Sequence, residues 1–247
     1  MESVLDRVIK QNTENVNLLK TKDYNIFSVL QIQSKEVLIC RMIADLLNPR
    51  GQHGAGAEYL KIFLRDCLGM EKMDTKLADQ AIVTAEYAID DERRIDIVIE
   101  IGSYFLPIEV KIYAADQKSQ CFDYYQYAKR RDAQAKVYYL TLDGHRPGKD
   151  STSSGSQSVP EEDIVCLSFR EHILNWLKAC KNCGNTGMIP ILEQFIQNIE
   201  QISGYISEKV RNMVIDELLK SGDSLRAGMQ IADSINAAKA KRFCSKL

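Results

Sequence analysis

The chain has 247 residues, of which 45% are apolar and 27% charged, with a formal net charge of -2 and a pI near 6.0. This length supports one large domain or a domain with a helical extension, and the composition is that of an ordinary globular protein. The balanced charge excludes a globally basic nucleic-acid-binding protein, so any such binding needs a local patch.

Helices are predicted in the first part of the chain, where apolar residues recur with a period of 3.6. They cover about residues 3–19, 26–47 and 57–68, and Asn48-Pro49 with the glycine-rich turn 51–56 ends the second. From residue 81 the period changes to two. This predicts strands at about 81–89, 94–101 and 104–113, the last two forming an antiparallel hairpin across Gly102-Ser103.

The second half of the chain alternates helices and strands before it becomes helical. We predict a helix at 116–131, a strand at 136–142, a mobile Gly/Ser/Pro-rich surface loop at 143–160, a strand at 164–168, and helices at 169–181, 189–203, 207–220 and 222–243. This order predicts an α/β fold with a mixed central sheet flanked by helices. We divide the chain into a core, 1–170, and C-terminal helices, 171–247, that pack on the core or form a small subdomain.

Opposite charges interrupt the apolar strand Leu-Pro-Ile-Glu-Val-Lys-Ile-Tyr at 106–113. Because side chains alternate along a strand, Glu109 and Lys111 share one face, and Asp96 on the preceding strand can join them. A wet sheet face would explain these charges equally well.

Glu36 adds a third acidic side chain. If 26–47 is one helix, Glu36 lies in the middle of its apolar stripe, which comprises Val29, Ile32, Ile39, Cys40, Ile43 and Leu47. An unpaired carboxylate there costs several kcal/mol, a penalty that a metal ion or Lys111 would remove.

The predicted helix after these strands carries Gln117, Gln120, Tyr124 and Tyr127 on one face, where amides and phenols can contact phosphates or bases. An amphipathic helix with aromatic packing is an equally common interpretation. Residues 129–149 hold six basic side chains, among them Arg130 and Arg131, against two Asp, an excess of 6 - 2 = +4 that suits a phosphate backbone.

These parts suit metal-assisted hydrolysis of a phosphodiester. Carboxylates on two strands bind Mg²⁺ or Mn²⁺, and the metal lowers the pKa of water and neutralises charge in the transition state. A lysine on the same face can orient the attacking water or stabilise the developing oxyanion.

The same residues resemble the PD-(D/E)XK nuclease superfamily: a helical Glu36, Ile95-Asp96, Glu109-Val110-Lys111 and Gln120-Cys-Phe-Asp-Tyr124. The stretch SKEVLICRMIADLLNPRGQHGAG is similar to an uncharacterised bacterial subgroup of that superfamily. The resemblance covers about residues 25–170, and Ile95 stands where the family's first motif has proline. It implies a restriction-endonuclease-like core.

The resemblance also implies roles for individual residues. Asp96 and Glu109 would bind the metal together with the carbonyl of Val110, and Glu36 would help hold the metal or its water. Lys111 would be the catalytic lysine, and Gln120 would contact the substrate backbone or that lysine. The expected activity is a Mg²⁺-dependent nuclease acting on DNA in preference to RNA, and a homodimer is compatible with it. The alternative is a non-catalytic nucleic-acid-binding or protein-binding module with the same fold.

The cysteines and histidines give weaker signals. Seven cysteines, with no apolar signal-peptide core ahead of them and no run long enough to span a bilayer, predict reduced thiols in a cytoplasmic protein. Cys180 and Cys183 have the spacing of a zinc or redox pair but lack a second pair. His53 suits a proton shuttle or, as the preferred interpretation, a structural role in its turn.

Overall fold

The computed structural model describes residues 24–71, 74–183, 185–205, 215, 216 and 218–244. The helix expected at 3–19 and most of the one expected at 207–220 lie outside these residues. Contacts divide the chain into two units, Asn25–Tyr205 and the residues on either side of it. The second unit includes α11 (Gly222–Cys244). Helices α8 and α9, which the sequence analysis assigned to the C-terminal part, belong to Asn25–Tyr205.

The first unit is built on a five-stranded mixed sheet with the order β1-β2-β3-β4-β7. Its strands are β1 (Ile82–Ala88), β2 (Arg94–Ile101), β3 (Tyr104–Lys111), β4 (Val137–Thr141) and β7 (Ile164–Ser168). The first three form an antiparallel meander, and β3, β4 and β7 run parallel. Each strand lies within two residues of its predicted range, and the predicted mixed α/β fold is confirmed.

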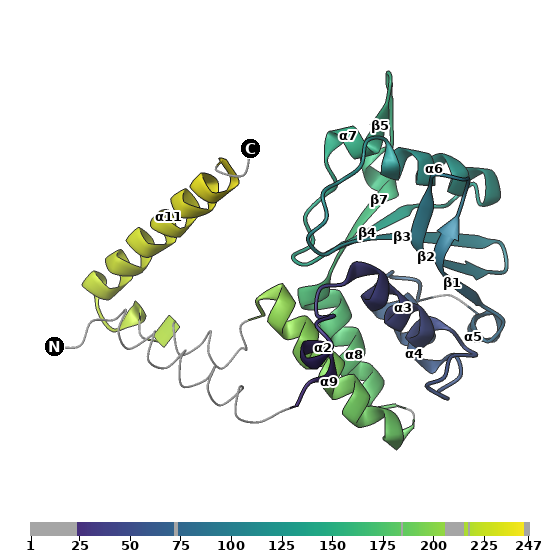
Figure 1. Ribbon diagram of the computed structural model, residues 1–247, viewed down its shortest axis with the longest axis horizontal. Coiled ribbons are helices and arrows are strands. Elements are labelled where there is room, and N and C mark those ends of the chain that lie inside the picture. Colours follow the sequence, from purple (N-terminus) through teal and green to yellow (C-terminus); the bar gives the residue numbers. More distant parts are fainter. Residues whose placement is uncertain (1–23, 72–73, 184, 206–214, 217, 245–247) are drawn as a thin grey trace. The chain divides into compact units, whose positions relative to one another are not determined.

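Helices cover both faces of this sheet (Figure 1). On one face are α3 (Glu36–Leu47), α4 (Glu58–Asp66), α8 (Leu174–Lys181) and α9 (Ile189–Ser203), and on the other is α6 (Gln120–Arg131). The shorter helices are α2 (Ile26–Val29), α5 (Thr75–Ala78), α7 (Lys149–Thr152), the 3-10 turns Glu161–Asp163 and Thr186–Met188, and the π-helical turn Phe169–Ile173. From Ile97 onward, the period of two in β2 divides its side chains between the two cores: Ile97 and Ile99 pack with the first group of helices, and Val98 packs with α6. Ile95, which the same period would place with Ile97, packs on the α6 side.

The prediction of one helix over 26–47 is wrong. The chain breaks between α2 and α3, with Gln31 in the left-handed region at φ 55°. Helix α2 packs instead on α9: the Asn25 side-chain amide donates to the Gln194 carbonyl, and Phe27 stacks on Phe195. Tertiary contacts thus override the helical periodicity, and Val29, 55% exposed, does not share an apolar stripe with Glu36.

The segment 143–160 is not an irregular loop. It contains α7 and a hairpin of β5 (Ser153–Ser154) and β6 (Gln157–Ser158). Asp116 accepts hydrogen bonds from the Gly148 N–H and from the Tyr139 hydroxyl, which ties this segment to the sheet. The composition of the segment predicted its turns but could not reveal these distant partners.

A glycine-rich turn joins α3 to α4 around His53, whose side chain is buried. Its Nδ1 accepts from the Ala55 N–H and its Nε2 donates to the Asn48 carbonyl, so the imidazole bridges the turn, and the ring stacks on Tyr59. A Cβ at Gly51 would lie 2.2 Å from the Asp45 carbonyl oxygen and 2.6 Å from the His53 ring. Only glycine therefore fits at this position.

Substitution Gly51→Ala should lower the free energy of unfolding by about 1–3 kcal/mol, because the new methyl group overlaps a backbone carbonyl that cannot move away. Urea denaturation measures the change. Gln52→Ala, at an exposed position of the same turn, is the matched control and should be neutral. Equal stability of the two variants would show that the turn has room for a side chain.

Candidate active site

The hydrogen-bond ladder between β2 and β3 ends at the pair Ile97 and Ile108. One step further, the antiparallel register places Asp96 opposite Glu109. There the Val110 N–H donates to Asp96 Oδ2 at 2.7 Å, and the Ile112 N–H donates to Glu36 Oε2 at 2.8 Å. The carboxylates of Asp96 and Glu36 thus accept from the two N–H groups that no longer have a partner in β2. These bonds bring Glu36, Asp96 and Glu109 close together.

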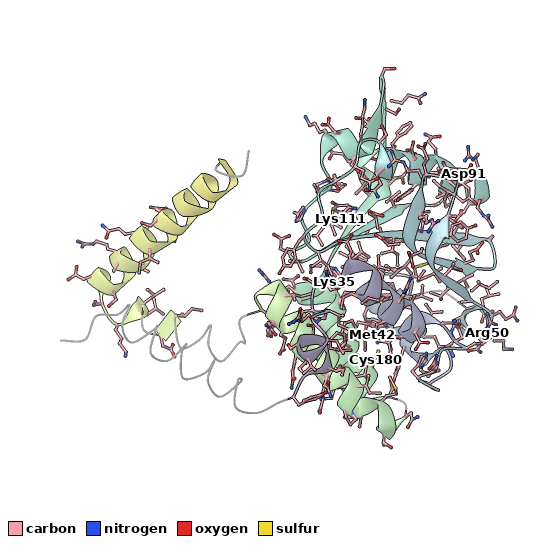
Figure 2. All side chains as sticks on the ribbon, viewed as in Figure 1. Lys35, Met42, Arg50, Asp91, Lys111 and Cys180 are labelled. Atoms are coloured by element: carbon pink, nitrogen blue, oxygen red, sulfur yellow. The ribbon has the colours of Figure 1, made fainter. Side chains whose placement is uncertain are left out.

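Glu109 and Lys111 are buried rather than solvated, with 1% and 6% of their surface exposed. Their side chains form an ion pair. Figure 2 shows Lys111 among side chains of the sheet and its covering segments. The wet-face interpretation of these charges is therefore wrong, because α6 packs on this face.

Burial and the neighbouring charges both act on the pKa values of Glu109, Asp96 and Lys111. Burial raises the pKa of Glu109 well above its usual range, and the neighbouring Asp96 charge raises it further. Burial likewise raises the pKa of Asp96, against the hydrogen bond from Val110. Burial alone would lower the pKa of Lys111, but Glu109 and the other carboxylates outweigh it, so that pKa is raised. Lys111 is therefore a cation that holds together carboxylates which repel each other.

The acceptor atoms at this point fit a divalent cation. Glu109 Oε2 is buried and has no hydrogen-bond donor among the described residues. The carbonyl of Val110 is on the same strand edge as its N–H, which faces Asp96, because both groups of a strand residue point to one side. Two carboxylates and a carbonyl are the hard oxygen ligands that Mg²⁺ and Mn²⁺ prefer.

A complete cage is not preformed: the described residues contain no cluster of three or more His, Cys, Asp or Glu arranged to hold a metal. One carboxylate oxygen of Glu36 already accepts a hydrogen bond from the Ile112 N–H. Water and substrate would therefore have to supply the remaining ligands, as is usual for Mg²⁺.

Helix α6 begins at Gln120, four residues later than predicted, after Ser119 in the left-handed region. Gln120 is buried; its Nε2 donates to the Tyr124 hydroxyl, and its Oε1 has no donor among the described residues. Tyr124 in turn donates to the Arg94 carbonyl, so its phenol fixes β2 rather than facing solvent. Gln117 precedes the helix and accepts from Arg93. The predicted face that joined Gln117 to Gln120 does not exist.

Arg130 and Arg131 lie at the opposite end of α6, about 15 Å along the helix from Gln120. Arg131 pairs with Glu100 at 2.7 Å, and Arg130 lies over the Tyr127 ring. The other basic side chains of 129–149 are dispersed: Lys129 pairs with Asp163, and Arg146 donates to the Glu161 carbonyl. The structure therefore does not bring Arg130 and Arg131 to the carboxylates.

Residues near the site also include some that the sequence analysis did not single out. Cys40 on α3 is buried, and its pKa is raised by burial and by the charges of Asp96, Glu36 and Glu109. Asp116 joins β4 to the segment before α7 through Tyr139 and Gly148. No spacing motif could have revealed Asp116, because its partners are 23 and 32 residues away. Cys183, just after α8, donates to the Ala179 and Cys180 carbonyls at the end of that helix, and the described cysteines are free thiols.

Replacing Asp96 with Asn should raise the free energy of unfolding in metal-free buffer by about 1 kcal/mol. Asn keeps an oxygen for the Val110 N–H but removes a half-buried charge that repels Glu109. Urea denaturation with EDTA tests this, with Asp91→Asn as the control at an exposed site on the edge of the molecule (Figure 2). A loss of stability in Asp96→Asn alone would mean that this carboxylate is a net stabilising group.

Comparison with known proteins assigns the fold to a family. The model of the PD-(D/E)XK nuclease superfamily matches residues 24–207, which include the whole sheet and the three carboxylates. No curated protein and no solved structure matches the chain. Among the described residues, no helix is both long and apolar enough to cross a membrane. With the mixed sheet, the Asp96 and Glu109-Val110-Lys111 strands and this match in agreement, the chain belongs to the PD-(D/E)XK nuclease superfamily.

Proposed function

We propose that this protein is a metal-dependent nuclease that hydrolyses phosphodiester bonds in DNA in preference to RNA. The observation that carries the proposal is the buried Glu109 carboxylate, which faces Asp96, pairs with Lys111 and keeps Oε2 without a donor among the described residues. Family membership supports the same activity, since the match spans the site.

The metal-binding groups would be the carboxylates of Asp96 and Glu109 with the carbonyl of Val110. When bound there, Mg²⁺ or Mn²⁺ supplies a Lewis acid that lowers the pKa of water and offsets charge on the phosphate. Glu36, held by the Ile112 N–H, is half-buried beside this group and would hold a water ligand. The hydrogen bonds from Val110 and Ile112 fix both carboxylates in advance of binding.

Lys111 would orient the attacking water and stabilise the oxyanion that develops on the phosphate. Its ammonium has three donors, of which Glu109 accepts one, and it stays charged because the carboxylates raise its pKa over the opposing effect of burial. Gln120 presents a buried oxygen that can accept from this lysine or from a water beside it.

The non-catalytic alternative leaves the composition of this site unexplained. Glu109 and Lys111 are buried and Asp96 is half-buried beside them, which costs desolvation energy that an apolar cluster of equal volume would not. Groups that lower stability in this way are expected at functional sites, where the chemistry needs them. DNA preference, a homodimer and a cytoplasmic location remain predictions from the sequence.

Cleavage assays test the proposal with supercoiled plasmid, single-stranded DNA and RNA, each with Mg²⁺, Mn²⁺ or EDTA. We expect metal-dependent cutting, most rapid on DNA, that falls at least about 100-fold in Glu109→Gln and in Lys111→Met. Glu100→Gln and Lys136→Met make the same changes at positions with greater exposure and should stay active. Binding of nucleic acid without cutting under every metal would support the non-catalytic alternative.

Metal binding has a readout that is independent of cleavage. Millimolar Mn²⁺ should raise the thermal midpoint of the parent protein, since a ligand that binds only the folded state stabilises it by RT ln(1 + [L]/Kd). Glu109→Gln should lose this shift, whereas Glu100→Gln should keep it. A shift that persists in Glu109→Gln would place the cation elsewhere.

A further inference from the structure

The hairpin β5–β6 projects from the first unit beside α7 (Figure 1). Its outer residues Ser154, Gly155, Ser156, Gln157 and Ser158 are all exposed, and the residue range 151–159 carries no charge. Gly155 makes the tip with φ 60°, a conformation that favours glycine. The hairpin therefore presents hydroxyl and amide groups to the outside, with no apolar surface to bury.

The base of the hairpin is fixed to the N-terminus of α6. Ser119 donates through its hydroxyl to the Ser153 carbonyl at 2.8 Å and through its N–H to the Asp150 carbonyl at 2.7 Å. The buried Ser151 hydroxyl accepts from the Cys121 N–H, and the Val159 N–H donates to the Thr152 carbonyl. Because the base is buried and hydrogen-bonded, it holds the exposed tip of the hairpin in a fixed direction, in which the tip can contact a bound molecule.

This base lies next to the candidate active site. Helix α6, whose first residues hold this base through the bond from Cys121 to Ser151, packs on β3, the strand that carries Glu109 and Lys111, and also contacts α7 and β5. Gln120 donates to the Tyr124 hydroxyl, and Tyr124 donates to the Arg94 carbonyl of β2, so the start of α6 is tied to both strands of the site. A polymer that brings a phosphate to Glu109 and Lys111 from outside would therefore pass near the base of the hairpin.

We propose that the β5–β6 hairpin enters the major groove of duplex DNA beside the bond to be cut, a proposal that rests on the nuclease function above. Serine hydroxyls and a glutamine amide donate and accept hydrogen bonds to base edges and to the sugar–phosphate backbone. Lys149 in α7 and Lys118 before α6 are exposed near its base and can contact phosphates. The acids Asp150, Glu161 and Glu162 are exposed on the segments that flank the hairpin, so phosphate contacts near the base would depend on these two lysines.

The dimensions favour this groove over others. The backbones of two paired strands lie about 4.8 Å apart, and their side chains add to this width. The B-form major groove, about 12 Å wide, admits such a two-stranded ribbon, whereas the minor groove, about 6 Å wide, is too narrow for it. Two residues of extended chain reach roughly 7 Å, which approaches the groove's depth of about 8.5 Å. The A-form major groove of duplex RNA is too narrow and deep for side chains to read.

Binding measured by fluorescence anisotropy tests the proposal on duplex DNA, single-stranded DNA and duplex RNA of equal length, with Ca²⁺ present. The triple variant Ser154→Ala, Ser156→Ala, Gln157→Ala removes the polar tip and leaves the anchored base intact. Its Kd for duplex DNA should rise about tenfold, as expected for the loss of a few hydrogen bonds, with single-stranded binding unchanged. Gln134→Ala, an exposed glutamine beyond the other end of α6, is the control. An unchanged thermal midpoint shows that the variant is folded.

Three outcomes would overturn the proposal: an unchanged Kd for duplex DNA, equal weakening of duplex and single-stranded binding, or a loss confined to RNA. Failure of the nuclease function is distinguishable from these. If the parent binds duplex DNA through the hairpin but never cuts it, the hairpin inference stands and the proposed catalysis is wrong.

Discussion

The N–H groups of Val110 in β3 and of Ile112, which directly follows that strand, determine the geometry of the site. Both point to the edge that β2 has left, and buried donors there require acceptors. Asp96 and Glu36 provide them from a strand and from the first turn of a helix, so main-chain hydrogen bonding fixes the positions of two carboxylates. The same two bonds tie the start of α3 and the start of β2 to the end of β3. Carboxylate oxygens thus accept from β3 and the residue after it beyond the end of the ladder with β2.

Glu109 and Lys111 show what this arrangement costs. Both are on the side of β3 that α6 covers, in an environment that disfavours charge. The ion pair offsets part of that cost, but Asp96 opposes it from the neighbouring strand. These charges lower stability at this one sheet position, while Ile97, Ile99 and Ile108 on the opposite face supply apolar burial that holds the sheet in place.

The strands could be predicted from the sequence because alternation of apolar and charged side chains is local. Asp96, Glu109 and Lys111 therefore meet as their spacing predicted, and the family match supports the fold. Glu36 reaches the same place for a different reason from the one expected: it begins α3 and accepts from Ile112, whereas the apolar stripe assigned to it crossed a break in the chain. Periodicity cannot detect partners that are distant in sequence. Three features of the structure depend on such partners: the separation of Gln117 from Gln120, the ion pair of Arg131 with Glu100, and the ordered segment after Gly148.

Helix α2 and helix α9 lie at the two ends of the first unit, and the bond from Asn25 to Gln194 joins positions 169 residues apart. Asn25 also donates to Gln197, 172 residues away, so α2 and α9 close a loop that spans most of the unit. This contact should form late in folding, after the local meander of β1, β2 and β3. It also means that segments before Asn25 and after Tyr205 can vary in length without displacing the strands that carry Asp96 and Glu109.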